Sequence, residues 1–308
     1  MAGLKRAIPL LLLLCILLPG CNGSEEETES SKLNIVATTG MIADMVKNIG
    51  GDSVSVLALM GPGVDPHLYK ATQGDLGRLQ KAEVIFYNGL HLEGKMGEVF
   101  EKLGRIKKVV PVAGRLNTAM LLQDPVYKDA FDPHIWFDVA LWAQTAQVVL
   151  EALVEQDPDS ERYYTQNLEV YTEELDTLHN WVKEQLSTIP EDKRIMITAH
   201  DAFSYFGRAY GIEVRGLQGI STLSEFGLKD RVDLVNFIVD KEIKAVFVET
   251  SVSEKNINAI VEGCQQKGHA VTIGGNLYSD AMGAEGTPEG TYMGMVKSNV
   301  NTLVNSLK

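Results

Sequence analysis

The sequence predicts an α/β protein of two lobes, each with a parallel β-sheet flanked by helices, joined by one long rigid helix with a cleft between the lobes. Short runs rich in Val and Ile alternate with segments of helical periodicity in both halves of the chain, a pattern typical of parallel sheets with right-handed crossovers. Between the halves lies one amphipathic segment too long for a single lobe. The length of 308 residues also allows two separate cores.

The chain begins with a predicted signal peptide over residues 1–20. Two basic residues near the N terminus precede an almost unbroken apolar run over 7–18. A run of about 12 residues is too short to span a bilayer, which needs about 20, but it fits a signal-peptide core. A small residue before Cys21 resembles a bacterial lipobox, in which the Cys is lipidated, although Pro19 departs from the usual small residue. Ordinary cleavage that leaves a free Cys21 is the alternative.

Residues 21–31 are predicted to be a lipid-anchored flexible tether, because they are mostly Gly, Ser, Thr and Glu and contain no large apolar residue. We therefore expect an exported, membrane-anchored lipoprotein that faces the periplasm or the extracellular side. Cysteine use agrees with this expectation. Once Cys15 is removed with the signal peptide and Cys21 is processed, only Cys264 remains, so no internal disulfide can form.

The first lobe is predicted over residues 32–156. Its strand candidates are short runs rich in Val, Ile and aromatic residues, at 33–38, 54–59, 84–87 and 108–112. The intervals between these runs have helical periodicity. In the first interval the apolar residues of 41–49 fall on one helical face, and the pair Gly50–Gly51 is expected to end that helix.

The linking helix is predicted over 157–189. Asp157 is a good N-cap, and Pro158 suits the first helical position. Apolar residues then recur at spacings of three and four until Pro190, which cannot continue a helix: Leu168, Tyr171, Leu175, Leu178, Val182 and Leu186. About 30 residues at 1.5 Å each give a helix about 45 Å long, which exceeds what one lobe needs.

The second lobe, over 190–308, repeats this organisation without repeating the sequence. Its strand candidates are at 194–199, 212–216, 245–249 and 270–274, and its helix candidates are at 228–239, 254–266 and 292–307.

The formal net charge of −13 disfavours nucleic acid as a partner, because an acidic surface repels phosphate. The same charge suits a cation. The sequence contains no G-x-x-x-x-G-K-[ST] pattern, so we do not expect the protein to hydrolyse nucleotide itself.

Four side chains are candidate metal ligands: His67, His134, His200 and Asp280. Three of them lie past the carboxyl ends of predicted strands, where open α/β sheets bind their ligands. Two come from each predicted lobe, so closure of the cleft would bring them together. Imidazole with carboxylate suits zinc, and also manganese or iron where the carboxylate is bidentate.

Each candidate also has a structural interpretation. A lone His in a loop rich in Gly and Pro is usually a solvated turn residue, and Asp280 alone would be a turn or N-cap residue. The spacing matches neither a zinc finger nor an H-E-x-x-H helix. The metal hypothesis therefore depends on joint placement. His91, His179 and His269 have no such companions and are expected to have structural or surface roles.

Several motifs resemble the cluster A-I solute-binding lipoproteins of zinc and manganese ABC transporters, a family of ZnuA-, TroA- and PsaA-like proteins, and the TroA type most of all. The resemblance covers the chain from about residue 33 to its end. It is carried by G-P-G-V-D-P-H-L-Y at 61–69, V-I-F-Y-N-G-L-H-L-E at 84–93, D-P-H-I-W-F-D at 132–138, A-H-D-A-F-S-Y-F at 199–206, S-D-A-M-G at 279–283 and G-T-Y-M-G-M-V at 290–296.

The resemblance implies a protein that binds a divalent metal between its lobes and delivers it to an ABC permease, which has a separate ATPase. It implies a monomer and the same four ligands: His67, His134, His200 and Asp280. Manganese-specific members tend to have Glu where this chain has His200, which favours zinc. Zinc-specific members often have a His-rich loop in the first lobe, but 116–130 contains no His. Zinc and manganese therefore both stay open, with Fe²⁺ as a further candidate.

Two other functions stay open at the level of sequence. A zinc hydrolase would need an open metal position and a nearby general base, for which Glu249 and Glu225 are the candidates, although either could be a surface carboxylate or a partner of a ligand. A surface adhesin lipoprotein would need an exposed recognition patch, which a sequence does not display.

Overall fold

The computed structural model describes residues 32–224 and 226–308. The predicted signal peptide, the lipidation site Cys21, the tether and Glu225 lie outside the described residues. Residues Lys32–Lys308 form one compact unit. Of the helices in this unit, none is both long enough and apolar enough to cross a membrane.

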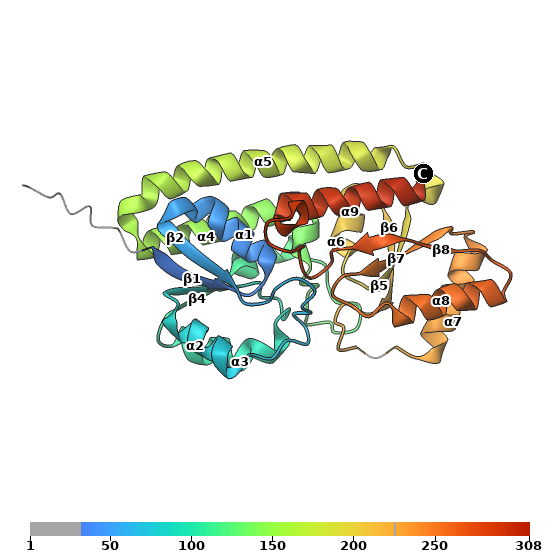
Figure 1. Ribbon diagram of the computed structural model, residues 1–308, viewed down its shortest axis with the longest axis horizontal. Helices are drawn as coiled ribbons and strands as arrows, with labels where there is room; N and C mark the ends of the chain where they lie inside the picture. The colour runs from blue at the N-terminus through green and yellow to red at the C-terminus, as the bar shows by residue number, and fades with distance from the viewer. Residues whose placement is uncertain (1–31, 225) are drawn as a thin grey trace, which may run out of the picture. The chain divides into compact units, whose positions relative to one another are not determined.

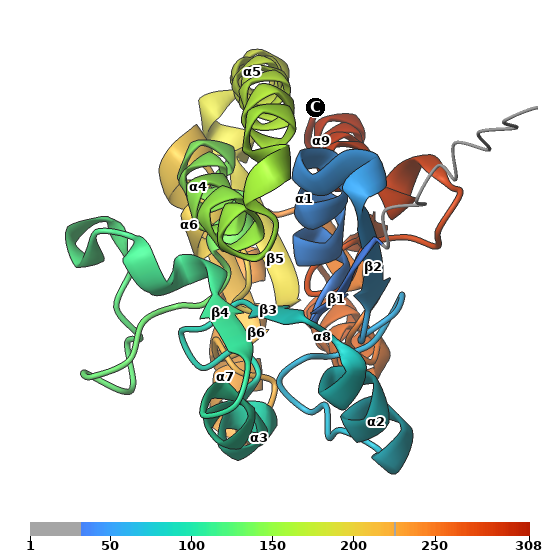
Figure 2. The ribbon, with the colours of Figure 1, turned by 90° about the vertical axis from the view of Figure 1, so that its left-hand side faces the viewer.

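The first lobe is built on a four-stranded parallel sheet with the order β2-β1-β3-β4 (Figures 1 and 2). Its strands are β1 (Leu33–Ala37), β2 (Val54–Ala58), β3 (Val84–Tyr87) and β4 (Lys108–Pro111). These bounds match the predicted runs to within one residue. Its first three helices are α1 (Gly40–Gly50), α2 (Gln73–Lys81) and α3 (Gly97–Gly104).

Helices cover both faces of this sheet, as Figure 2 shows. The side chains of β1 alternate between the two faces: Ile35 and Ala37 join the core under α1, whereas Val36 joins the smaller core under α2 and α3. Burial on both faces explains why the strands read as nearly continuous apolar runs rather than as alternating ones.

The second lobe contains two parallel strand pairs, β5-β6 and β7-β8, and β5 packs beside β7. Its strands are β5 (Ile195–His200), β6 (Glu213–Gln218), β7 (Ala245–Glu249) and β8 (Thr272–Leu277). Its helices before the last one are α6 (Ser204–Tyr210), α7 (Leu228–Asp240) and α8 (Lys255–Gln266). Helix α6 is not among the predicted elements.

Strand β8 begins and ends later than predicted. Its end lies later because the pair Gly274–Gly275 continues the strand instead of ending it. A Cβ at Gly274 would lie 2.9 Å from Ser306, and the Ser306 hydroxyl donates to the Gly274 carbonyl at 2.6 Å. The glycines therefore allow a helix to pack closely on the strand.

The long helix α5 (Glu161–Ser187) has the predicted position and burial. Every predicted stripe residue except the partly buried Leu168 is buried: Tyr171, Leu175, Leu178, Val182 and Leu186. A 3₁₀ turn, Pro158–Ser160, precedes the helix. Asp157 makes no side-chain cap bond there, because its carboxylate accepts from the Tyr164 hydroxyl at 2.8 Å.

Two further helices pack along α5. Helix α4 (Val139–Gln156) is not among the predicted elements, because its buried residues spread round more than one face instead of forming one stripe. Helix α9 (Tyr292–Leu307) runs beside α5 in Figure 1 and packs on α1 of the first lobe as well as on β8 of the second. A single core cluster consequently includes residues of both lobes. The exact lobe boundaries, at 156 and 190, stay a prediction.

Candidate metal centre

Four separate segments supply the candidate ligands. His67 lies in the loop between β2 and α2, and His134 directly precedes the 3₁₀ turn Ile135–Phe137. His200 is the last residue of β5, whereas the sequence predicted that it directly follows the strand. Asp280 lies in the loop that follows β8.

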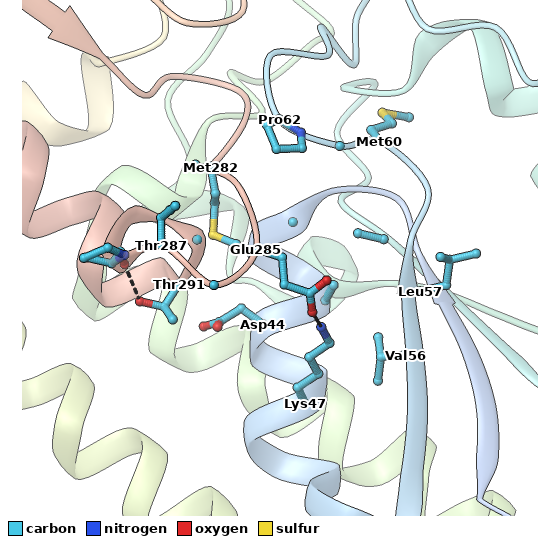
Figure 3. Close-up of a pocket in the computed structure, with 18 residues that line it drawn as sticks. Asp44, Lys47, Val56, Leu57, Met60, Pro62, Met282, Glu285, Thr287 and Thr291 are labelled. Carbon is cyan, nitrogen blue, oxygen red and sulfur yellow. Dashed lines mark hydrogen bonds and ion pairs between the residues drawn. The ribbon is translucent and has the colours of Figure 1, made fainter.

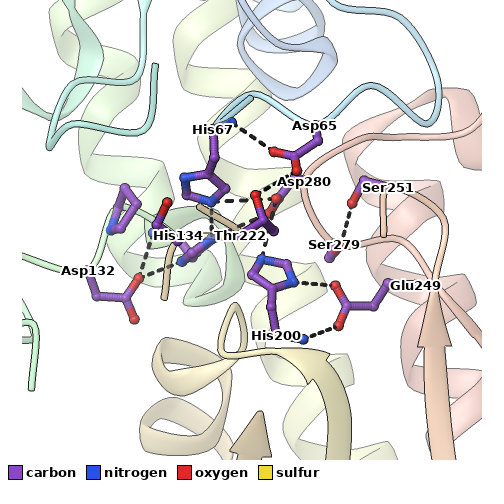
Figure 4. Close-up of polar contacts among 12 residues, drawn as sticks. Asp65, His67, Asp132, His134, His200, Thr222, Glu249, Ser251, Ser279 and Asp280 are labelled. Atoms are coloured by element: carbon purple, nitrogen blue, oxygen red, sulfur yellow. Dashed lines mark hydrogen bonds and ion pairs between the residues drawn. The ribbon is translucent and has the colours of Figure 1, made fainter. Parts of the chain in front are cut away.

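The structure brings all four predicted residues together in a buried cluster between the lobes (Figure 4). One ligand atom from each lies within 4.8 Å of those of the other three. Within the described ranges this is the only group of three or more His, Cys, Asp or Glu side chains that could share an ion. At most 2% of any of the four residues is exposed.

The three imidazoles face the Asp280 carboxylate with their Nε2 atoms. The Nε2 atoms of His67 and His200 lie 3.6 and 3.3 Å from Asp280 Oδ2, and His134 Nε2 lies 3.4 Å from Oδ1. Both carboxylate oxygens and His200 Nε2 are buried without a hydrogen-bond partner among the described residues. Buried polar atoms normally have partners, so these atoms form a set of donors that a cation could bind.

His134 is held by its neighbour two residues back. Asp132 Oδ1 lies 2.7 Å from His134 Nδ1 and accepts the His134 backbone N–H at 2.9 Å. Because Nδ1 is engaged in this way, Nε2 is the ring nitrogen that remains for the cluster.

His200 has the same arrangement with a residue far along the chain. Glu249, the last residue of β7, places Oε2 2.5 Å from His200 Nδ1 and accepts the backbone N–H with Oε1 at 2.9 Å. Both oxygens of this carboxylate are therefore occupied by His200. Glu249 is accordingly not free to act as the general base of a hydrolase.

His67 is held through its backbone. Asp65 Oδ1 accepts the His67 N–H at 2.8 Å, and Asp65 Oδ2 accepts from the Thr222 hydroxyl of the second lobe at 2.6 Å. Gly63, in the same loop, has a φ of 71°. This left-handed turn favours glycine and lets the loop approach Thr250.

Buried contacts tie the His134 and Asp280 segments together. Trp136 Nε1 donates to the Ser279 carbonyl at 3.1 Å, and the Tyr292 hydroxyl donates to the Trp136 carbonyl at 2.7 Å. The Tyr205 hydroxyl of α6 also donates to the Asp132 carbonyl at 2.9 Å. These hydrogen bonds fix the segment that carries His134 relative to the segment that carries Asp280.

The electrostatics of the cluster follow from its burial and its carboxylates. Burial lowers the pKa of His134, but Asp132 and Asp280 outweigh burial and raise that pKa to about 9. Burial also lowers the pKa of His200, and Glu249 with Asp280 raises it well above its usual value. Burial lowers the pKa of His67 to about 3, against the opposing effect of Asp280. The carboxylates therefore favour the protonated forms of His134 and His200, whereas burial favours the neutral form of His67.

The remaining histidines lie outside the cluster. His179 on α5 contacts the Tyr210 hydroxyl at 3.0 Å, and His269 Nε2 lies 2.6 Å from the Ile243 carbonyl. His91 is exposed.

A cavity of about 650 Å³, drawn in Figure 3, is a separate feature of the molecule. It lies between α1, the edge strand β2 and the 282–291 loop, and none of the four cluster residues lines it. An exposed ion pair, Lys47 with Glu285 at 3.1 Å, crosses this cavity. Exposed pairs of this kind contribute little to stability.

Two α/β lobes that share long helices and enclose a small buried polar cluster define a solute-binding protein. The model of the family described as "ZnuA: Zinc-uptake complex component A periplasmic" matches residues 35–306. The chain belongs to this family.

Similar proteins cover almost the whole chain. The chain is 48% identical over 307 residues to the manganese-binding lipoprotein MntA of Bacillus subtilis, covering 99% of each protein. It is 47% identical over 285 residues to the zinc-binding protein TroA of Treponema pallidum, covering 92% of each. The solved structure of that TroA superposes with a TM-score of 0.87, covering 90% of this chain and 99% of that one. The metal ABC transporter substrate-binding lipoprotein SloC of Streptococcus mutans is 31% identical, covering 98% of this chain and 99% of that protein.

Proposed function

We propose that this protein binds a divalent metal ion outside the cytoplasm and delivers it to an ABC permease for uptake. The single observation that carries the proposal is the buried convergence of three imidazole Nε2 atoms on one carboxylate between the lobes. Such a donor set has little use in a fold except to bind a cation, because it leaves Asp280 without hydrogen-bond partners in the part of the chain that the structure describes.

We assign His67, His134, His200 and Asp280 as the metal ligands. Imidazole and carboxylate together suit Zn²⁺, and a carboxylate with two available oxygens also suits Mn²⁺ or Fe²⁺. The relatives' names support both of the first two ions, since MntA is named for manganese and TroA for zinc. Three imidazoles favour zinc.

The proposed pathway begins with capture of the ion and ends with docking. The acidic protein attracts the cation, the four ligands enclose it, and the loaded protein docks on a membrane permease that works with a separate ATPase. The relative SloC is named as a substrate-binding lipoprotein of a metal ABC transporter, which supports this set of partners. We also propose lipidation at Cys21, attachment to the membrane through that lipid, and a monomeric state.

Helices α5 and α9 are suited to a carrier that moves little. Both pack against elements of the two lobes, and the core between the lobes is continuous. Loading and release would therefore move loops near the cluster more than they rotate the lobes.

The test is metal analysis of protein purified without added metal salts. One zinc or manganese ion per chain is expected, and Ala substitution at each of the four ligands is expected to weaken binding of that ion. His179→Ala is the matched control, because this His lies on α5 outside the cluster. Unchanged affinity in all four ligand variants would refute the assignment, and metal-dependent turnover of a substrate would favour the hydrolase.

A further inference from the structure

We propose that Asn88 and Glu93 are positioning residues for His134: the Glu93 carboxylate fixes Asn88, and the Asn88 side chain holds the backbone that carries His134. This inference rests on the proposed role of His134 as a metal ligand. It concerns the run 84–93, which contributes no ligand to the cluster.

Glu93 is a buried carboxylate surrounded by neutral donors. Only 4% of the residue is exposed. Its Oε1 accepts from the Thr38 hydroxyl at 2.6 Å and from the Asn88 backbone N–H at 2.7 Å. Thr38 follows β1 and Asn88 follows β3, so this one oxygen joins the ends of two neighbouring strands.

The backbone between Asn88 and Glu93 is held in a conformation that side chains rarely adopt. Gly89, Leu90 and His91 have φ values of 84°, 52° and 64°. Non-glycine residues keep such a conformation only where the surrounding contacts enforce it, and such residues concentrate at functional sites. Here the left-handed run turns the chain back, so that Glu93 reaches the N–H of Asn88.

The Asn88 side chain connects this turn to the candidate metal centre. Its Nδ2 donates to the Pro133 carbonyl at 3.0 Å and to the Gly89 carbonyl at 3.1 Å. Pro133 directly precedes His134, so the contact fixes the peptide from which the ligand extends. Asn88 is 1% exposed, and its backbone carbonyl accepts from the Ala113 N–H at 3.1 Å. The Asn88 backbone is therefore fixed, and the side chain is held through Nδ2, since Oδ1 has no hydrogen-bond partner among the described residues.

Two hydrogen bonds and one peptide bond consequently form one path: Glu93 to Asn88, Asn88 to Pro133, and Pro133 to His134. Asp132 orients the imidazole ring of His134, whereas Asn88 fixes the position of the backbone to which that ring is attached. Loss of Asn88 should displace the His134 Nε2 atom relative to Asp280 without removing any ligand.

The test measures the zinc affinity of the wild-type protein and its variants by competition with a chromophoric chelator. Asn88→Ala and Glu93→Ala are expected to weaken zinc binding about tenfold, the lower end of what losing a partner of a metal ligand costs. Glu93→Gln should restore most of the affinity, because its carbonyl can still accept from Thr38 and Asn88. If Asn88→Ala proves too unstable to purify, Thr38→Val interrupts the same path and should weaken binding severalfold.

A double-mutant cycle separates positioning from a general loss of stability. In a His134→Ala background, Asn88→Ala should cost no further affinity, whereas in an Asp280→Ala background it should keep its full effect. Asn299→Ala is the matched control. This buried carboxamide holds the backbone of Tyr278, two residues before Asp280, with hydrogen bonds of 2.9 and 2.7 Å. The effects of Asn299→Ala and His134→Ala on zinc affinity should be additive.

Equal costs of Asn88→Ala in the two backgrounds, or unchanged affinity in the single variants, would overturn the inference. Failure of the proposed function looks different, because the wild-type protein would then bind neither zinc nor manganese and His134→Ala would change nothing.

Discussion

The Glu249 carboxylate contacts His200 twice, at the ring Nδ1 with 2.5 Å and at the backbone N–H with 2.9 Å (Figure 4). The two residues end neighbouring strands and lie 49 positions apart in the sequence. This double contact fixes both the direction of the imidazole ring and its Cα position, so that Nε2 points at Asp280. Asp132 does the same for His134 from only two residues away.

Glu249→Gln should weaken zinc binding by about 10- to 100-fold, because the amide cannot accept from both His200 donors at once. The measurement is chelator competition at neutral pH. Glu262→Gln, an exposed change on α8, serves as the control and should have no effect. An unaltered affinity in Glu249→Gln would show that His200 needs no such partner.

Zinc affinity should rise with pH across the neutral range. The carboxylates Asp132 and Asp280 outweigh burial and raise the pKa of His134 to about 9, so this ring carries a proton at pH 7 that the metal must displace. Each proton released changes the apparent affinity by about tenfold per pH unit. Calorimetric titrations in buffers of different ionisation enthalpy count those protons. Equal affinity at pH 5 and pH 7.5 would argue against imidazole ligation.

Asp44→Asn should stabilise the protein at pH 7.5 and have little effect at pH 4. Burial raises the pKa of Asp44 from 3.8 to about 6, despite a backbone hydrogen bond that lowers it. The folded state therefore binds the proton more tightly than the unfolded chain, so the free energy of unfolding falls as pH rises from about 4 to 6 and stays lower above that range. Removing the charge should recover about 1–2 kcal/mol at pH 7.5.

Denaturant unfolding of the metal-free protein at both pH values measures this effect. Asp52→Asn is the control, since that side chain is exposed. A stabilisation of the same size at pH 4 would mean that the gain does not come from the buried charge.

Thr222→Val should speed the release of zinc. The Thr222 hydroxyl donates to Asp65 across the two lobes at 2.6 Å, beside the loop that carries His67. One such hydrogen bond contributes about 1 kcal/mol, so its loss should raise the dissociation rate about fivefold. Stopped-flow mixing with excess chelator gives the rate, and Thr222→Ser should behave like the wild-type protein. A rate unchanged in Thr222→Val would show that this contact does not retain the ion.

Local patterns in the sequence were enough to predict the strands and the long helix, and together with the family resemblance they predicted the four residues of the cluster. A buried parallel strand must be apolar over its whole length, and the buried stripe of α5 must recur every three or four residues, so both leave a local signal. His67, His200 and Asp280 could be found because each lies at or past the carboxyl end of a parallel strand, where open α/β sheets bind their ligands. His134 depended on its D-P-H motif and on the family resemblance.

Tertiary structure alone decided which distant residues hold those ligands. The pairing of Glu249 with His200 and the contact of Asn88 with Pro133 join segments 49 and 45 residues apart, far beyond the range of any helical or strand periodicity. Helix α9 belongs to the second half of the sequence, yet it packs on α1. Such contacts depend on where whole elements pack against one another, a property that no short window of residues contains.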